Sequence, residues 1–527
     1  MGFIDDVRAG YREANDKHAQ RQGKKAPSPD RKPSLLAPSP IKFGYYHDRS
    51  RDQVLSSSPL LFEGERHVVM FGLNGAGKST RFLIELLMTA SHRSLCVLDV
   101  KGELAYQTAQ ERERHGEVRI INPYRLHGMR SDGFEPLAHL KHDDPMLYDR
   151  AAAIADGLIE IEPGSQQYWS ESAQGLLTAI IMWEVVRAHR EHRPASLLNV
   201  RLMMTEPEEW KNYKDAAGQP KKKLVKGLKV IARRMVEEGG ETIKSLVGRF
   251  VRDDGRDELA GIQSTADTQT QWMLADPFRR EFGRKDGVDF RALRRKPVTV
   301  YAVIPAEEIT RKRRYTRVLM ASALAAHFEP GPVKTLFVLD EFRAAVGSMN
   351  IINDMWSLVR GYGVQLMPIL QSALQLKALF NDEWENYVAQ AGVVATLGPP
   401  GDMFTAEWMS KRCGVTTVMQ AGFNLGDGWN AGTGTNAGVG HSGLNGSSNR
   451  SRGANFGNST SGGINFQQAE RHAFLPNELM DLPPGHGRLW LPGMGTRSVP
   501  YFAPNYWKRR QGAEGVARVK KNPFRTG

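Results

Sequence analysis

The chain has 527 residues, of which 40% are hydrophobic and 24% charged, so it is long enough to bury a large core in two or more domains. Its two cysteines, Cys96 and Cys413, exclude a disulfide framework and favour a reducing compartment. The formal net charge of +13 favours a polyanionic partner, nucleic acid or anionic lipid, over the alternative of a merely solvated basic surface. The sequence shows neither a signal peptide nor an apolar run of about 18 residues, so we expect a soluble or peripheral protein without a transmembrane segment.

Residues 1–52 are polar and basic, with prolines scattered among Lys, Arg and Ser. A segment of this composition buries too little apolar surface to fold alone. We therefore predict a basic, flexible N-terminal arm over 1–52.

A glycine-rich turn follows between a predicted strand and a predicted helix. Residues 72–79 read Gly-Leu-Asn-Gly-Ala-Gly-Lys-Ser, with an apolar run at 67–71 before them and helical apolar spacing at 80–88 after them. In this arrangement backbone N–H groups converge on a phosphate at a helix N-terminus. Lys78 would reach the β- and γ-phosphates, and the Ser79 hydroxyl would bind Mg²⁺. The predicted nucleotide-binding residues are Gly72, Asn74, Gly75, Ala76, Gly77, Lys78, Ser79 and Thr80.

Strands and helices alternate on both sides of a helical stretch. Strand patterns at 93–99 and 118–123 place the first part of a nucleotide-binding domain at 53–138, and those at 297–304, 335–340, 364–370 and 392–397 place its second part at 286–420. This alternation predicts an α/β fold with a mostly parallel sheet and helices on both faces.

Between these two parts, at 139–285, the strand pattern fades and an apolar stripe recurs at helical spacing. We predict an inserted all-α domain, with its aromatic stripe as core packing and not as a base-stacking platform. The basic run at 221–223 would be explained by a solvated face. The stripe consists of Trp169, Ala173, Leu176, Leu177, Ile180, Ile181 and Val185.

Residues 421–466 are dominated by Gly, Asn, Ser and Thr, and they contain few apolar side chains. Burial of so few apolar groups does not offset the entropy of ordering the segment, so we predict a flexible loop. Order resumes at 467–507 as the C-terminal part of the nucleotide-binding domain, and a basic tail follows at 508–527.

An acidic pair, Asp340 and Glu341, ends the predicted strand at 335–340. Ligands bind at the carboxyl ends of strands in open α/β sheets. We expect Asp340 to bind Mg²⁺ and Glu341 to polarise the attacking water. An acidic pair that merely caps a strand is the alternative.

Two further residues are candidates from their positions alone. Arg360 lies at the end of the predicted helix after the acidic pair, where it would stabilise transition-state charge, within the chain or across a subunit interface. Gln371 follows the strand at 364–370 and would sense the γ-phosphate. For Arg360, a helix cap or a surface charge is an equal alternative.

Several sequence blocks occur in an order that resembles the type IV secretion coupling proteins, the TraG-like conjugative DNA-transfer ATPases. They cover most of residues 60–507, and one of them, Asp99-Val100-Lys101-Gly102-Glu103, is close to the family's Asp-Pro-Lys-Gly-Glu run. The others are 67–79, 122–123 with 134–137, 168–169, 300–305, 340–342, 360–363, 371–372 with 375–376, and 475–479.

The resemblance implies a RecA-like P-loop NTPase core with an inserted all-α domain, assembled as a homo-hexamer. It implies ATP and Mg²⁺ as cofactors, DNA (single-stranded favoured), a relaxase or other secreted protein and type IV secretion channel components as partners, and a cytoplasmic location or a peripheral one at the inner membrane. Lys78, Glu341, Arg360 and Gln371 would be catalytic, with Arg360 as the in-trans finger, and Ser79 and Asp340 would hold the metal. The chain departs from the family in two respects: it shows no N-terminal membrane-spanning helices, and Val100 replaces the usual Pro.

Two other functions remain open at this level. An FtsK-like translocase would run the same engine on duplex DNA, and a non-motor adaptor would use ATP to switch its assembly and recruit a protein. An ABC-type ATPase is rejected, because the chain contains no Leu-Ser-Gly-Gly-Gln signature.

Overall fold

The structure is a computed structural model. It describes residues 38–48, 52–161, 167–216, 219–251, 256–284, 286–349, 351–353, 356, 362–438, 449–491, 498–508, 519–520 and 522.

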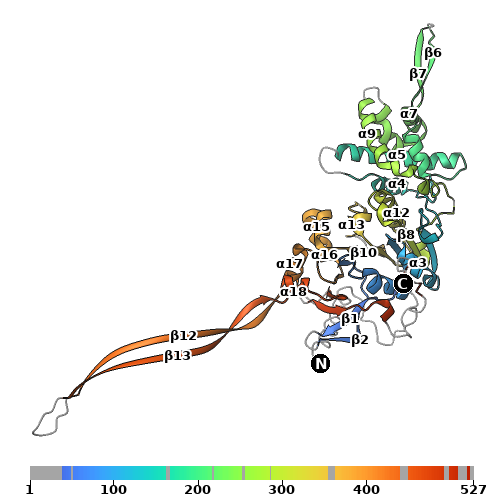
Figure 1. The fold of residues 1–527 in the computed structure, drawn as a ribbon. Coiled ribbons are helices and arrows are strands. Elements are labelled where there is room, and N and C mark those ends of the chain that lie inside the picture. Colours follow the sequence, from blue (N-terminus) through green and yellow to red (C-terminus); the bar gives the residue numbers. More distant parts are fainter. Residues whose placement is uncertain are drawn as a thin grey trace, which may run out of the picture.

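One sheet of eleven strands organises the described chain (Figure 1), in the order β2-β1-β15-β14-β11-β3-β10-β9-β4-β8-β5. The strands from β11 to β5 are parallel to one another, and β14, β15, β1 and β2 extend the sheet with antiparallel pairs. The parallel strands are β3 (Val68–Gly72), β4 (Ser94–Asp99), β5 (Glu117–Ile121), β8 (Val298–Val303), β9 (Thr335–Leu339), β10 (Val364–Leu370) and β11 (Val393–Leu397). The antiparallel strands are β1 (Ile41–Asp48), β2 (Gln53–Phe62), β14 (His486–Trp490) and β15 (Val499–Phe502).

Helices cover both faces of this sheet, as the sequence predicts. In β3, Val69 and Phe71 belong to one hydrophobic core while Val68 and Met70 belong to another. Strands buried on both faces appear as continuous apolar runs, which is why these strands are recognisable in the sequence. The flanking helices are η1 (Lys78–Leu83, of π type), α2 (Ile84–Thr89), α3 (Glu103–Arg112), α12 (Arg313–Ala325), α13 (Phe342–Ala345), α15 (Ala373–Phe380), α16 (Trp384–Gln390), α17 (Met403–Arg412) and α18 (Pro476–Met480).

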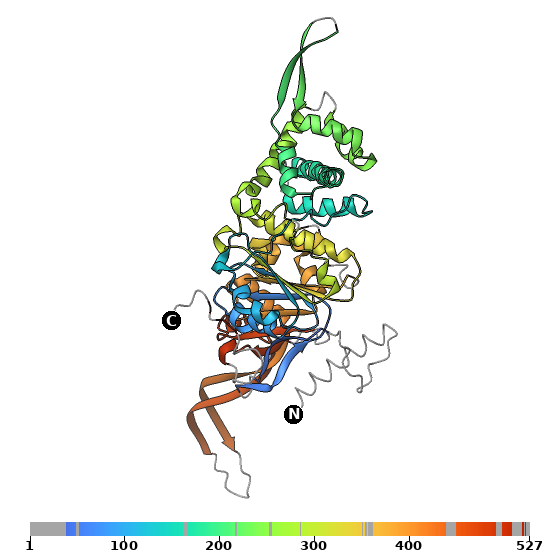
Figure 2. The same ribbon diagram turned by 90° about the vertical axis from the view of Figure 1, so that its right-hand side faces the viewer.

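A helical domain is inserted between β5 and β8, and Figure 2 shows it stacked on one end of the sheet domain. Its long central helix α5 carries the predicted apolar stripe, which is core: Ala173 and Ile180 are fully buried, and the Trp169 ring packs against Gly261 of α9. None of the helices in the described ranges is long and apolar enough to cross a bilayer. The domain contains α4 (Leu147–Leu158), α5 (Gln167–Arg190), α6 (Leu197–Met204), α7 (Leu228–Glu238), α8 (Glu241–Val247), α9 (Arg256–Thr270), α10 (Asp276–Arg279) and α11 (Ala292–Arg295).

The inserted domain is mainly helical but not wholly so, which corrects the all-α expectation. Strands β6 (Glu209–Lys214) and β7 (Pro220–Lys226) form an antiparallel hairpin between α6 and α7. Its residues are mostly exposed, so it lacks the apolar alternation by which a strand is recognised in a sequence.

The N-terminal arm predicted over 1–52 is also corrected at its end, because residues 41–48 form strand β1 between β2 and β15. Ile41 and Phe43 are buried, and the Phe43 ring stacks on Phe82 at 5.2 Å between centroids. These few apolar residues bury only against distant parts of the chain, so their local sequence shows no core. The rest of the arm, up to residue 37, lies outside the described residues.

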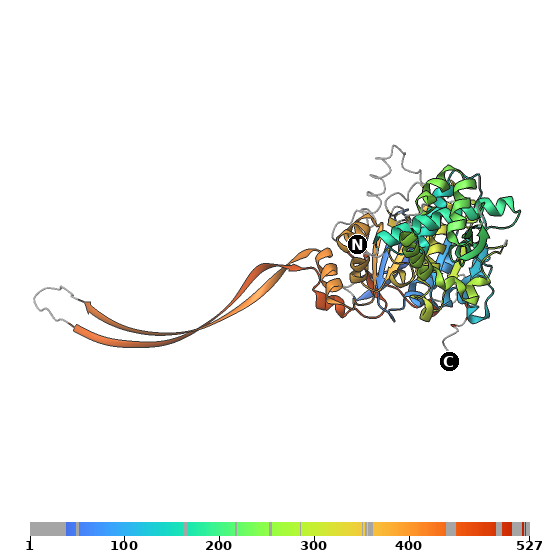
Figure 3. The ribbon, with the colours of Figure 1, turned by 90° about the horizontal axis from the view of Figure 1, so that it is seen from above.

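The largest correction concerns the predicted loop at 421–466. Its described residues, 421–438 and 449–466, belong to a long antiparallel ribbon of β12 (Val415–Gly438) and β13 (Asn449–His472), which extends away from the body (Figures 1 and 3). Residues 439–448 lie outside the described residues. At about 3.4 Å per residue, each strand is on the order of 80 Å long. The ladder satisfies the backbone N–H and C=O groups whatever the side chains are, so low apolar content does not exclude it.

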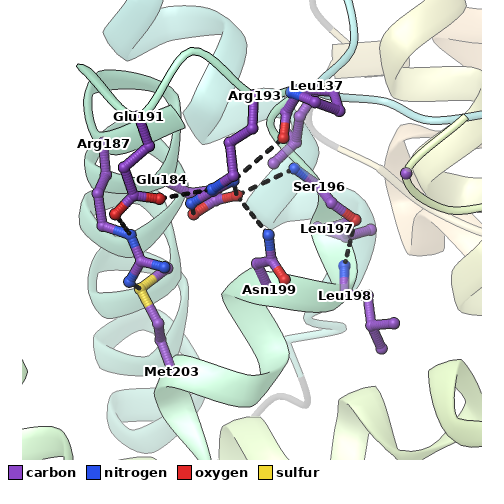
Figure 4. Close-up of polar contacts among 12 residues, drawn as sticks. Leu137, Glu184, Arg187, Glu191, Arg193, Ser196, Leu197, Leu198, Asn199 and Met203 are labelled. Atoms are coloured by element: carbon purple, nitrogen blue, oxygen red, sulfur yellow. Dashed lines mark hydrogen bonds and ion pairs between the residues drawn. The ribbon is translucent and has the colours of Figure 1, made fainter. Parts of the chain in front are cut away.

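A buried ion pair holds the turn between α5 and α6 (Figure 4). The Glu184 carboxylate has no solvent exposure, and it accepts hydrogen bonds from Arg193 Nη2 at 2.9 Å, from Asn199 Nδ2 at 2.9 Å and from the backbone N–H of Ser196 at 3.2 Å. The side chain of Ser196 in turn accepts from the N–H of Leu198 at the start of α6. One carboxylate thus fixes the geometry of a helix–helix connection.

Replacement of this carboxylate tests how much it contributes to the stability of the fold. Glu184→Ala removes the buried acceptor of three groups, Arg193, Asn199 and the Ser196 N–H, so we expect a loss of about 2–4 kcal/mol in the free energy of unfolding. Glu191→Ala removes the exposed partner of the same arginine and serves as the control, with an expected loss below about 1 kcal/mol. Urea denaturation followed by circular dichroism measures both, and equal losses would contradict the assignment.

Candidate functional site

The glycine loop after β3 has the backbone geometry that its sequence predicts. Gly75 and Gly77 have φ values of 85° and 89°, in the left-handed region that favours glycine. A Cβ on Gly77 would lie 2.8 Å from the Arg81 side chain, so a larger residue here would also displace Arg81. Gly77 caps η1, which begins at Lys78, and the loop therefore presents the start of a helix to the pocket beside it.

Lys78 joins this loop to the end of β9. Its Nζ donates to the Gly72 carbonyl at 3.0 Å and lies 3.5 Å from Glu341 Oε1. Only 9% of the Lys78 side chain is exposed. The loop lysine and the acidic pair, distant in sequence, thus meet in one site.

The acidic pair lies where β9 ends. Glu341 has a φ of 49°, an uncommon left-handed conformation for a residue with a side chain. Asp340 Oδ1 is buried and has no hydrogen-bond partner among the described residues. The pKa of Asp340 is raised to about 6. Burial is the main cause, the charge of Lys78 opposes it, and the charge of the neighbouring Glu341 adds to it. Strain and an unsatisfied carboxylate are both typical of functional sites.

A second buried acid, Asp99, stands at the end of the neighbouring strand β4. Burial raises its pKa to about 7 against the hydrogen bond that its Oδ2 accepts from the Ala105 N–H at 2.7 Å, and the charge of Asp340 raises it further. Lys101, on the same loop, lines the pocket and lowers the pKa of Asp340. The Asp99–Glu103 block, whose chemistry the sequence does not reveal, therefore lies in the pocket of the glycine loop.

Gln371 is brought to the acidic pair. It follows β10, and its Nε2 donates to Glu341 Oε2 at 3.0 Å. Glu341 is thus held by Lys78 through one carboxylate oxygen and by Gln371 through the other. Arg360 lies outside the described residues.

A pocket of about 730 Å³ lies beside the glycine loop, lined by Lys78, Asp99, Lys101, Asp340 and Glu341, whereas Gln371 contacts Glu341 from outside this lining. Of the predicted nucleotide-binding residues, Asn74, Gly75, Gly77, Lys78, Ser79 and Thr80 line it; Gly72 supports Lys78, and Ala76 is partly buried and packs against one of the two cores.

Distant residues that the sequence did not assign to the site complete the pocket. Thr80 Oγ1 donates to Asn505 Oδ1 at 3.1 Å, and Arg81 Nη1 donates to the Ala503 carbonyl at 2.8 Å. Asn505 and Trp507 line the pocket. No local sequence pattern indicates that these residues belong to the site. Asp99, in contrast, could have been recognised as an acid at the end of a buried strand.

The comparison with protein families decides the relationship. Residues 15–438 match the family described as type IV secretory system conjugative DNA transfer, which is most of the chain. The chain belongs to this family. The resemblance seen in the sequence blocks is therefore confirmed.

Individual members of the family are distant relatives of this one. The chain is 24% identical to a conjugal transfer protein TraG of Escherichia coli over 72% of its length, and 24% identical to the type IV secretion system-coupling protein VirD4 of Bartonella quintana over 79%. A TraG of Agrobacterium fabrum is 26% identical over 68%. The chain spans only 53 to 60% of the length of these three relatives.

Solved structures of the coupling protein TrwB share the fold. The unbound form has a TM-score of 0.55 and 15% identity, with 84% of each chain covered. The complex with ADP and Mg²⁺ has a TM-score of 0.56 and 14% identity, with 86% of this chain and 87% of that one covered. The fold is thus a RecA-like P-loop NTPase core with a mostly parallel sheet and an inserted helical domain.

The two buried carboxyls predict how stability depends on pH. Their pKa values, about 7 for Asp99 and about 6 for Asp340, lie above the ordinary value of 3.8, so the folded state holds these protons more tightly than the unfolded state. Below about pH 4 both carboxyls are protonated in the folded and unfolded states, and their contribution to stability is fully present. This contribution falls as pH rises above 4, and it levels off above pH 6–7, where the folded carboxyls ionise.

Asp340→Asn should remove part of this loss. Burial of the residue is incomplete, so we limit the expected gain to the order of 2 kcal/mol at pH 8; little change is expected at about pH 3.5, below the ordinary pKa of 3.8. Thermal unfolding at both pH values measures it, with the exposed Asp382→Asn as the control. A variant no more stable than the control at pH 8 would contradict the burial of this charge.

Proposed function

We propose that this chain is an ATP-hydrolysing coupling protein that recruits or pumps DNA, or DNA joined to a relaxase, toward a type IV secretion channel. The observation that carries the proposal is the meeting of Lys78, Asp340 and Glu341 at one pocket beside the glycine loop. Membership of the conjugative DNA transfer family and the nucleotide complexes of TrwB support it.

The residues present fit a Mg²⁺ ion with the nucleotide. Asp340 Oδ1, which has no hydrogen-bond partner among the described residues, is a hard anionic ligand, and it lines the same pocket as Ser79, whose hydroxyl is of the kind that binds Mg²⁺ in P-loop enzymes. Asp340 and Ser79 would hold the ion, and when bound it would neutralise charge on the transferred phosphoryl group. The fold is shared with a TrwB structure that contains ADP and Mg²⁺.

The phosphates of ATP would lie against the loop. Gly75 and Gly77 let the backbone turn its N–H groups toward them, and the η1 N-terminus adds a favourable dipole. Lys78, already in contact with Glu341, would exchange this partner in part for the β- and γ-phosphates. This exchange would free Glu341 as phosphate enters.

Glu341 would then act on water. Its carboxylate would accept the proton of the attacking water, and Gln371 would hold its other oxygen. Through the same contact, Gln371 would link the γ-phosphate to the position of Glu341. Arg360 would serve as an in-trans finger for a neighbouring subunit, and a homo-hexameric ring would supply that neighbour.

The basic character of the chain agrees with a DNA substrate, for which we favour single strands. A relaxase or other secreted protein and the channel components would be the protein partners. We place the activity in the cytoplasm, free or peripheral at the inner membrane.

Single substitutions separate binding from hydrolysis. Glu341→Gln should keep ATP and Mg²⁺ binding and lower kcat by about 10²–10⁴, because the water loses its base. Lys78→Ala should weaken ATP binding itself. Fluorescent-nucleotide titration and phosphate release measure the two effects, with the exposed Glu307→Gln as control; hydrolysis by Glu341→Gln at the control rate would contradict the assignment.

The DNA substrate separates the three functions. A single-strand motor should show an ATPase stimulated more by single-stranded than by duplex DNA, with binding that weakens steeply as salt rises. Stronger stimulation by duplex DNA would favour the FtsK-like translocase instead. Turnover that no DNA changes, together with relaxase capture that survives Glu341→Gln, would identify the adaptor.

A further inference from the structure

The hairpin β6–β7 lies at the far end of the helical domain from the sheet, and it projects away from the body (Figures 1 and 2). Residues 209–226 contain six lysines and only two acids. The aromatic residues Trp210 and Tyr213 on β6 are 48% and 45% exposed. The folded chain does not use this combination for its own packing.

The hairpin carries positive charge that the chain does not neutralise. Two lysines have acidic partners: Lys221 lies 2.9 Å from Asp215, and Lys226 lies 2.6 Å from Glu209. The remaining four have no ion pair among the described residues: Lys211, Lys214, Lys222 and Lys223.

Two of these charges face each other. In the register of the hairpin Lys211 is directly opposite Lys223, and the next pair is Asn212 and Lys222. Like charges directly opposite destabilise an antiparallel pair. An anion bound between the two ammonium groups would relieve this repulsion. Binding of an anion would therefore stabilise the hairpin.

The aromatic side chains lie beside two of the four lysines, Lys222 and Lys223. Trp210, Tyr213, Lys222 and Lys223 all line one depression of about 340 Å³, together with Arg233 of α7. Two acids at the root of the hairpin also line it, and four cations outnumber them: Lys222, Lys223, Lys229 and Arg233. Glu208 accepts from Trp210 Nε1 at 3.2 Å, and Glu206 accepts from the Gly227 N–H at 3.1 Å. Exposed aromatic rings among cations form the platform on which unpaired bases stack while the backbone meets positive charge.

A lipid surface is the other partner that attracts aromatic and basic residues, but the tip of the hairpin does not fit it. Between β6 and β7 the sequence reads Asp-Ala-Ala-Gly-Gln at 215–219, of which 217 and 218 lie outside the described residues, and Asp215 accepts from the Gln219 N–H at 2.9 Å. A hairpin that enters a membrane interface needs a large apolar residue there, whereas this tip carries an acid.

We propose that the β6–β7 hairpin is a single-stranded nucleic-acid contact, with Lys211, Lys222 and Lys223 on the phosphates and Trp210 or Tyr213 stacked on a base. The identity of this strand as the DNA to be transferred rests on the proposed function. The contact itself requires neither ATP nor Mg²⁺.

The test uses the full chain, a fluorescent 30-nucleotide poly(dT) and anisotropy without nucleotide over 50–200 mM salt. Lys211→Gln with Lys222→Gln and Lys223→Gln should weaken binding about tenfold or more and lower the slope of log K against log salt by roughly two, at about 0.7 per contact. Trp210→Ala with Tyr213→Ala should weaken it about fivefold or more with an unchanged slope.

A charge-matched control replaces the exposed Lys141, Lys244 and Lys411 by Gln and should leave the affinity within about twofold. Equal affinity of the hairpin and control variants for poly(dT) would overturn the proposal. So would a loss confined to vesicles of phosphatidylserine and phosphatidylcholine.

DNA-free ATP hydrolysis by the hairpin variants should equal that of the parent, which shows that they are folded. If the parent binds poly(dT) through the hairpin but hydrolyses no ATP, the proposed function fails while this inference stands. If it hydrolyses ATP but the lysine variant binds poly(dT) like the control, only this inference fails.

Discussion

The contact between Lys78 and Glu341 is the constraint on which the rest of the site depends. One ammonium group lies 3.0 Å from the carbonyl of Gly72 at the end of β3 and 3.5 Å from the carboxylate that follows β9. Strand β10 lies between these two strands and supplies Gln371 to the same carboxylate. Three neighbouring strands of a parallel sheet therefore deliver their C-terminal residues to one point, as expected for the carboxyl edge of an open α/β sheet.

This convergence has an electrostatic cost. Asp99 and Asp340 lie at the ends of adjacent strands, and burial raises the pKa of both. The charge of Asp340 raises the pKa of Asp99 further, and the charge of Glu341 raises that of Asp340 further. Lys78 and Lys101 offset part of this repulsion at Asp340. The buried Asp340 Oδ1 has no hydrogen-bond partner among the described residues, and a bound cation would offset the charge gathered there.

The sequence predicts the parallel strands and the glycine loop well, since both have local causes: apolar runs buried on two faces, and glycines that adopt positive φ. It also predicts the acidic pair, but not that Asp99 stands beside it. The order of strands in a sheet is set by long-range pairing, and β4 and β9 are neighbours only in space. The ribbon β12–β13 and the hairpin β6–β7 were missed for another reason, because a ladder of backbone hydrogen bonds does not require the apolar alternation that reveals a strand.

The pocket depends on residues 503–507 as well as on the glycine loop. Asn505 accepts from Thr80, Ala503 accepts from Arg81, and Gln107 of α3 donates to both the Tyr506 hydroxyl and the Lys520 carbonyl. The wall of the pocket beside the glycine loop is thus assembled from both ends of the sheet domain's sequence. An affinity tag, a truncation or a proteolytic cut after residue 500 would alter the affinity for a ligand of this pocket while leaving every residue of the loop intact.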